Sequence, residues 1–302
     1  MDNSKSSGTN LWATRPYKIF LVFNYSMLII LGLVCVLPII HIFAISLSSQ
    51  GPIARGQVSF WPVDLTWSGY QYVLRNDQFW SAMRISIYRV LLGLVVNMTV
   101  TILVAYPLSK DNETFPARTK YVFFFFFTML FSGGLIPSYL VVRYTGLIDT
   151  LWALVVPGAV QVYSVILMLN FFRQLPKELL EAAYVDGAGH VKTLLFIVLP
   201  CSTASIATIS LFCMVGHWNE WFSPIIYMNQ HTNYPLQTYM RSLLIDQRFT
   251  INSLDDTDLL KRLSNKTLTS AQIFIGMLPI MMVYPFLQKY FAKGIVLGSV
   301  KG

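Results

Sequence analysis

The stretch 181–200, EAAYVDGAGHVKTLLFIVLP, determines how this chain is organised. It begins with a glutamate and two alanines, turns at Asp186 and Gly187, and continues as an apolar run ending in Leu-Pro. A helix is predicted over 176–186, because Pro176 suits the first helical turn and Glu178 suits the positive end of the helix dipole. Gly187 suits a left-handed residue just past the helix end. The predicted order is a short helix, a bend and a long apolar helix.

The predicted short helix has a thin face, because Ala182 and Ala183 carry only methyl groups there. Such a face lets another backbone approach closely, which favours insertion into a groove of a partner protein. The alternative is a helix lying on the membrane surface, which is usually rich in basic residues. Here the acidic residues Glu178, Glu181 and Asp186 equal or exceed the basic ones, so we favour the groove.

The composition is that of an integral membrane protein. Of 302 residues, 55% are hydrophobic and 12% are charged, whereas soluble domains carry roughly 25% charged residues. The net charge of +8 invites a nucleic-acid interpretation. Basic residues that flank membrane spans and orient them explain the charge better. We therefore expect lipid around the chain and no nucleic-acid partner.

Six segments are long and apolar enough to cross a membrane, which takes about 20 residues. Several contain proline or glycine, which packed membrane helices tolerate. The predicted fold class is an all-α polytopic membrane protein, with a membrane domain over 20–291 between tails 1–19 and 292–302. The six predicted spans are 20–46, 86–108, 120–141, 149–172, 194–216 and 270–291.

Loop charges predict the orientation of the spans, because cytoplasmic loops carry an excess of lysine and arginine. By this rule both termini and the loop 174–195 are cytoplasmic. The segments 49–84 and 222–269 are then external, and the second is either a docking surface for an external partner or a spacer. Arg84 and Arg89, near the start of the second predicted span, are expected to extend outward to the membrane surface.

The sequence disfavours two classes of membrane protein. A secondary transporter usually needs ionisable groups near the middle of the bilayer, and the predicted spans contain no acidic residue at their centres. An intramembrane enzyme is disfavoured because the chain has no His-Glu-x-x-His and no Walker A sequence. We expect no catalytic residue, no metal site and no cofactor bound by this chain.

Five polar or aromatic residues of the spans are candidates to line a translocation path. Rings stack on sugar faces and amides bond hydroxyl groups, so both suit a sugar. Residues of these types more often form contacts between helices. The five candidates are Asn97, Tyr139, Tyr163, Asn170 and Asn219.

The pattern in the opening stretch resembles the EAA loop of bacterial ABC importer permeases. The segments 131–160, 217–228 and 294–302 are similar to the corresponding parts of carbohydrate-uptake permeases of the maltose type, within which the likeness is greatest to permeases for complex oligosaccharides. One departure is Leu194, where those permeases usually carry an aromatic residue. The matching positions of the loop are Glu181, Ala182, Ala183, Asp186, Gly187, Ala188, Leu199 and Pro200.

The resemblance implies a type I ABC importer fold in the bacterial cell membrane. It implies pairing with a second, related permease and with two ATPase subunits that bind the ATP. An extracytoplasmic binding protein would deliver a sugar or oligosaccharide, and the segment 222–269 would contact it. A permease of the same type for a non-sugar solute is the alternative.

The resemblance also assigns roles to residues. Glu181 would meet a basic residue in the ATPase groove, and Gly187 would set the angle between the two short helices of the loop. The end of the chain would reach between the ATPase subunits. That tail consists of Gly298, Ser299, Val300, Lys301 and Gly302.

Overall fold

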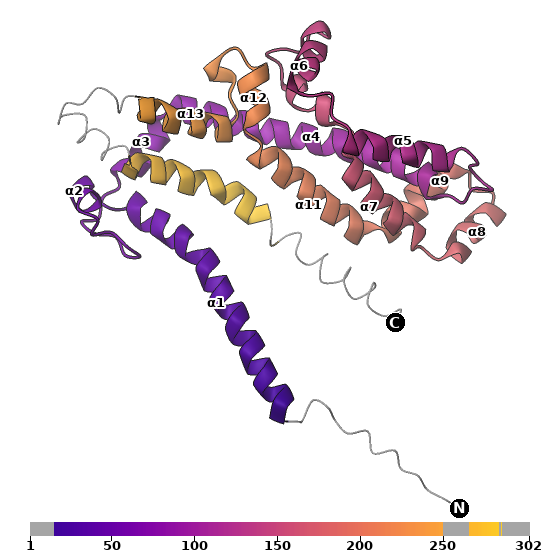
Figure 1. The fold of residues 1–302 in the computed structure, drawn as a ribbon, viewed down its shortest axis with the longest axis horizontal. Coiled ribbons are helices and arrows are strands. Elements are labelled where there is room, and N and C mark those ends of the chain that lie inside the picture. Colours follow the sequence, from indigo (N-terminus) through magenta and orange to yellow (C-terminus); the bar gives the residue numbers. More distant parts are fainter. Residues whose placement is uncertain (1–14, 250–265, 284, 286–302) are drawn as a thin grey trace, which may run out of the picture. The chain divides into compact units, whose positions relative to one another are not determined.

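The computed structural model describes residues 15–249, 266–283 and 285, and within them the chain is helical, with one isolated bridge between Ser48 and Leu65. The chain divides into two compact units (Figure 1). The first contains the described parts of 1–73 and 255–274, and the second contains those of 74–254 and 275–302. The tail positions Gly298 to Gly302 lie outside the described residues, as does 250–265.

The first unit is built on α1 (Arg15–Ser46), followed by α2 (Gln50–Ala54) and the beginning of α3 (Ser68–Arg75). Most of α1 is apolar and exposed on every side, as expected of a helix surrounded by lipid. Its end is tied to the helix Lys266–Val283 by the Thr267 hydroxyl, which donates to the Ser48 carbonyl at 3.1 Å. Gly69 lets α3 approach the same helix, because a Cβ there would lie 3.1 Å from that of Ala271.

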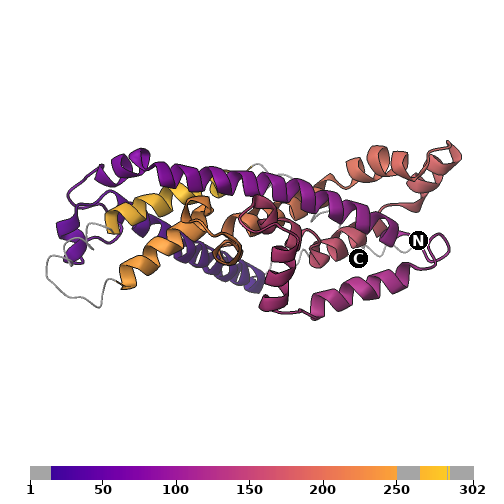
Figure 2. The same cartoon turned by 90° about the horizontal axis from the view of Figure 1, so that it is seen from above.

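The second unit is organised around α4 (Asp77–Ser109), which begins where the Asn76 side chain accepts a hydrogen bond from the Phe79 N–H at 3.0 Å. Figures 1 and 2 show α4 running between the part of the unit that holds α13 and the part that holds α8 and α9. Against it lie α7 (Val162–Arg173) and α11 (Thr203–Asn219). Their shared core is apolar and includes Met98, Ala105, Val165, Met168, Phe172, Leu194, Val198 and Ile209.

Three of the predicted spans correspond to bent pairs of helices. We expected tolerated irregularities at their prolines and glycines, and the structure shows sharp bends. Helix α5 (Arg118–Leu130) meets α6 (Leu135–Tyr144) at 111°, at a break where Gly134 has φ 89°. The short helices η2 (Leu151–Leu154) and η3 (Val156–Gly158) meet α7 at 53°.

The third bend divides the helical segment that follows the opening stretch of the sequence. Helix α9 (His190–Thr193), the π-helical turn η4 (Leu194–Val198) and α10 (Leu199–Cys201) together meet α11 at 82°. Pro200 lies just before this bend, and proline cannot donate the backbone hydrogen bond that would continue the helix. By length and composition, three described helices could cross a membrane, or up to six if each bent pair is one span.

The predicted external segment 222–269 is described over 222–249 and 266–269, and the last four residues begin the helix Lys266–Val283. It forms α12 (Phe222–Tyr227), η5 (His231–Asn233) and α13 (Leu236–Phe249). The predicted cytoplasmic loop 174–195 contains α8 (Lys177–Val185) and α9.

Candidate functional site

The short helix of the opening stretch is present as α8, with nine residues. It is shorter at both ends than the predicted range 176–186, because Pro176 is the N-cap and Asp186 the C-cap. Gly187 has φ 76°, as predicted for a left-handed residue at this point. Its N–H donates to the Tyr184 carbonyl at 3.0 Å, and the Ala188 N–H donates to the Ala183 carbonyl at 2.9 Å. This pair of bonds is the Schellman arrangement that closes a helix and redirects the chain.

The two sides of α8 differ in exposure. Ala183 is buried, and Leu180 packs in part against the core of the second unit. Glu181, Ala182 and Asp186 are exposed. The Glu181 side chain forms no hydrogen bond or ion pair with any described residue. Its carboxylate is exposed and therefore open to a group on another protein.

A cluster of four side chains, which we call the Tyr184 cluster, joins α8 and α9 to the end of α4. The Lys110 ammonium donates to the Tyr184 hydroxyl at 3.2 Å and lies 4.5 Å from the centre of the Tyr106 ring. His190 Nδ1 lies 3.3 Å from the same hydroxyl, and the His190 ring meets both tyrosine rings edge to face. Beyond the cluster, Lys177 pairs with Asp111 at 3.2 Å.

Leu194, the residue that departs from the resemblance, is buried in the core formed by α4 and α7. It therefore packs inside the second unit and is not part of the exposed side of the loop.

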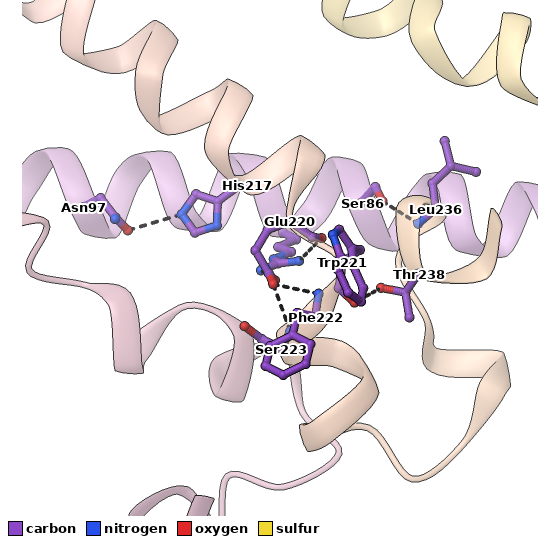
Figure 3. A network of polar contacts seen from close by, with 10 residues as sticks. Ser86, Asn97, His217, Glu220, Trp221, Phe222, Ser223, Leu236 and Thr238 are labelled. Carbon is purple, nitrogen blue, oxygen red and sulfur yellow. Dashed lines mark hydrogen bonds and ion pairs between the residues drawn. The ribbon is translucent and has the colours of Figure 1, made fainter. Parts of the chain in front are cut away.

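A second set of polar contacts, which we call the Glu220 network, lies at the C-terminal end of α11 (Figure 3). Arg89 of α4 is 2% exposed, and its guanidinium contacts the Glu220 carboxylate at 2.5 Å and the Glu220 carbonyl at 3.0 Å. The other carboxylate oxygen accepts the N–H groups of Phe222 and Ser223, both at 2.8 Å. The expectation that Arg89 extends outward to the membrane surface is therefore wrong, although Arg84 is exposed.

The Glu220 network also includes the chain around α13. Ser86 of α4 accepts the Leu236 N–H at 2.7 Å, and the Thr238 hydroxyl donates to the Trp221 carbonyl at 2.9 Å (Figure 3). The Arg241 guanidinium lies 3.4 Å from the centre of the Trp221 ring. One turn of chain after α11 is thus bound to both α4 and α13.

A third polar contact lies between these two groups along α4. The Asn97 side chain donates to the Gly158 carbonyl at 3.1 Å and lies 3.4 Å from His217 Nε2. A Cβ on Gly93 would overlap the His217 imidazole, so this glycine permits the close approach of α4 and α11.

An open cavity of about 560 Å³ lies near the start of α7. Two rings, an amide and three hydroxyl groups contribute to its lining. The Ser164 hydroxyl donates to the Gln161 amide oxygen at 3.2 Å, which leaves the amide NH₂ as a donor. The lining residues are Thr128, Met129, Val160, Gln161, Val162, Tyr163, Ser164 and Phe212.

The structure does not bring the five predicted path residues together. Tyr163 lines the cavity, and Asn97 is buried in the contact just described. Tyr139 is half-buried in α6, while Asn170 and Asn219 are exposed at the ends of α7 and α11. Their role in a path stays a prediction.

Sequence reasoning missed the Arg89–Glu220 pair, although a signal was present. An arginine inside a predicted span and a glutamate just after another span are two opposite charges in apolar surroundings, which usually pair.

Comparison with known proteins decides the family. The family model described as "Binding-protein-dependent transport system inner membrane component" matches residues 88–297. The chain belongs to this family. Its members are permease subunits of ABC importers in the cell membrane, and ATP hydrolysis belongs to a separate subunit.

Two relatives from Bacillus subtilis (strain 168) match along nearly their whole length. The polygalacturonan/rhamnogalacturonan transport system permease protein YtcP is 35% identical, over 94% of this chain and 99% of the relative. Protein LplC is 38% identical, over 96% of this chain and 97% of the relative.

A solved structure matches the fold. It is a chain of a bacterial ABC transporter involved in the import of the acidic polysaccharide alginate. The TM-score is 0.81 at 31% identity, and the match covers 92% of this chain and 98% of that chain. The fold is therefore that of a type I ABC importer permease, as the resemblance predicted.

Proposed function

We propose that this permease imports acidic oligosaccharides derived from polyuronate polysaccharides. The observation that carries the proposal is the whole-length similarity to two transport proteins whose described polymers are acidic, a galacturonan in one case and alginate in the other. The chain would work with a second permease, two ATPase subunits and an extracytoplasmic binding protein.

The cavity at the start of α7 is the part of the path that we assign to the sugar. The rings of Tyr163 and Phe212 offer faces for sugar rings, and Thr128 offers a hydroxyl group. The Gln161 amide, held by Ser164, can donate to a hydroxyl or a carboxylate.

The coupling function belongs to α8 in this proposal. Its small exposed face and the unpartnered Glu181 suit a groove on the ATPase that contains a basic residue. The Schellman turn at Gly187 fixes the angle between α8 and α9. We assign the segment 222–249 to contact with the binding protein.

Uptake measurements in intact cells test the substrate. Cells with and without the gene are given labelled oligogalacturonides and, separately, labelled maltooligosaccharides of similar length. The proposal predicts that deletion abolishes uptake of the acidic sugars only. The substrate assignment is wrong if deletion abolishes uptake of the maltooligosaccharides alone. It is also wrong if wild-type cells take up neither kind of sugar.

Variants in the same cells test the assigned residues. Tyr163→Ala should lower the uptake rate more than Tyr144→Ala, a control tyrosine that is exposed and outside the cavity. Glu181→Lys should lower the amount of ATPase recovered with the tagged permease. Wild-type recovery in Glu181→Lys would remove α8 as the docking element.

A further inference from the structure

Helix α4 is the one described helix within 74–249 that is long and apolar enough to cross a membrane without a break. Its 33 residues span about 50 Å at 1.5 Å per residue. The other candidate spans in that range are pairs bent by 53°, 82° and 111°. A bent pair can absorb a displacement at its break, whereas a continuous helix carries it from one end to the other.

At one end, α4 is joined to the coupling loop by side chains, although residues 110–173 separate the two along the chain. Lys110 donates to the Tyr184 hydroxyl of α8 and lies over the rings of both Tyr184 and Tyr106. The covalent links of α8 run to α7 through residues 174–176 and to α9 through the Schellman turn at Gly187. Neither link leads to α4, so the Tyr184 cluster provides a side-chain connection from α8 to α4 that the backbone does not.

Toward the other end, α4 is joined to the turn after α11 by the buried Arg89–Glu220 pair and to α13 by Ser86. Between the two ends, Asn97 and the Gly93–His217 contact keep α4 in register with α11. From Arg89 to Lys110 the helix covers about 30 Å. Arg89 and Ser86 at one end and Lys110 at the other each have a partner on a different element.

We propose that α4 is the element that transmits movement between the coupling helix α8 and the turn at Glu220, through the Tyr184 cluster at one end and the Arg89–Glu220 pair at the other. Lys110, Tyr184, Arg89 and Glu220 are positioning residues in this mechanism. The inference rests on the proposed function, because the movement is supplied by an ATPase bound to α8.

The experiment measures movement at α12 in intact cells, where all native partners are present. A single cysteine replaces Ile225, an exposed residue of α12, in a variant without the native cysteines. Its labelling rate with a membrane-impermeant maleimide is compared in ATP-replete and ATP-depleted cells supplied with oligogalacturonides. ATPase recovered with the tagged permease is measured in parallel, which separates loss of transmission from loss of assembly.

Lys110→Met and Arg89→Met should each reduce the ATP-dependent change in labelling by about 2- to 30-fold, the range seen for single substitutions along coupling networks. ATPase recovery should equal that of the wild type. Lys110→Arg keeps a cation beside the rings and should restore the response. Lys120→Met and Arg84→Met remove exposed charges near each end and should leave it unchanged.

Two results would overturn the proposal. One is a full response in Lys110→Met together with normal ATPase recovery, and the other is a wild-type response that does not depend on ATP. A failure of the proposed docking of the ATPase on α8 gives a different result. In that case the tagged Glu181→Lys permease would be recovered with as much ATPase as the wild type.

Discussion

The buried pair of Arg89 and Glu220 gives the sharpest prediction about stability. Replacing Glu220 by glutamine removes the charge but keeps an oxygen that can accept the N–H groups of Phe222 and Ser223. The Arg89 guanidinium, 2% exposed, then faces a neutral amide. The substitution therefore isolates the effect of leaving one buried charge without its counterion.

The magnitude follows from the burial of the two partners. Removing one member of a buried ion pair typically costs about 3–5 kcal/mol. The Glu220 side chain is 31% exposed, so water can partly compensate and the lower end, about 3 kcal/mol, applies. Arg89→Met should cost about 1–3 kcal/mol, because the remaining carboxylate keeps two N–H donors and access to water.

The double variant Arg89→Met with Glu220→Gln supplies the decisive comparison. It contains no unpaired buried charge, so it should be more stable than Glu220→Gln alone. Unfolding in mixed micelles, followed during titration with a denaturing detergent, measures all three variants. Arg84→Met, an exposed charge on the same helix, is the control and should lie within about 0.5 kcal/mol of the wild type.

The reasoning is refuted if Glu220→Gln is no less stable than Arg84→Met. It is also refuted if the double variant is less stable than Glu220→Gln, because the charge of Arg89 would then not be the source of the cost.

The same unfolding measurement checks three further predictions. Gly187→Ala should cost about 1–2 kcal/mol because φ is 76° there, and Gly187→Asn should cost less. Gly93→Ala should cost about 1–3 kcal/mol, since the new methyl group would overlap the His217 ring. Lys177→Met should change stability by less than about 0.5 kcal/mol, because its ion pair with Asp111 is exposed on both sides. A large loss in Lys177→Met, or none in either glycine variant, would contradict these assignments.

Local signals in the sequence predicted the structure of the loop 174–195 well. Pro176 and Gly187 act through their own backbone preferences, so the short helix and the left-handed residue after it followed from the sequence, with ends shifted by one residue. The apolar segments were equally visible, because membrane insertion depends on length and composition.

Long-range contacts set the features that the sequence did not reveal. Arg89 and Glu220 are 131 positions apart, and their charges in apolar surroundings indicate that each needs a partner without identifying that partner. The bend angles of the broken spans depend on packing between helices, so Pro200 and Gly134 indicate that a break is possible without fixing its angle. Leu194 is similar, because only the structure shows that it packs against α4 and α7.

The Arg89–Glu220 pair lies where the helix breaks between α11 and α12, and this break explains its position. Backbone N–H groups exposed by a break in an apolar region need acceptors, since water is scarce there. At the break before α6, Ser132 and Ser138 bond the backbone N–H and carbonyl of Gly134. Where α12 begins, a single carboxylate accepts two N–H groups, and its charge then requires Arg89. The same charge binds this turn to α4, which is why the turn and the continuous helix are expected to move together.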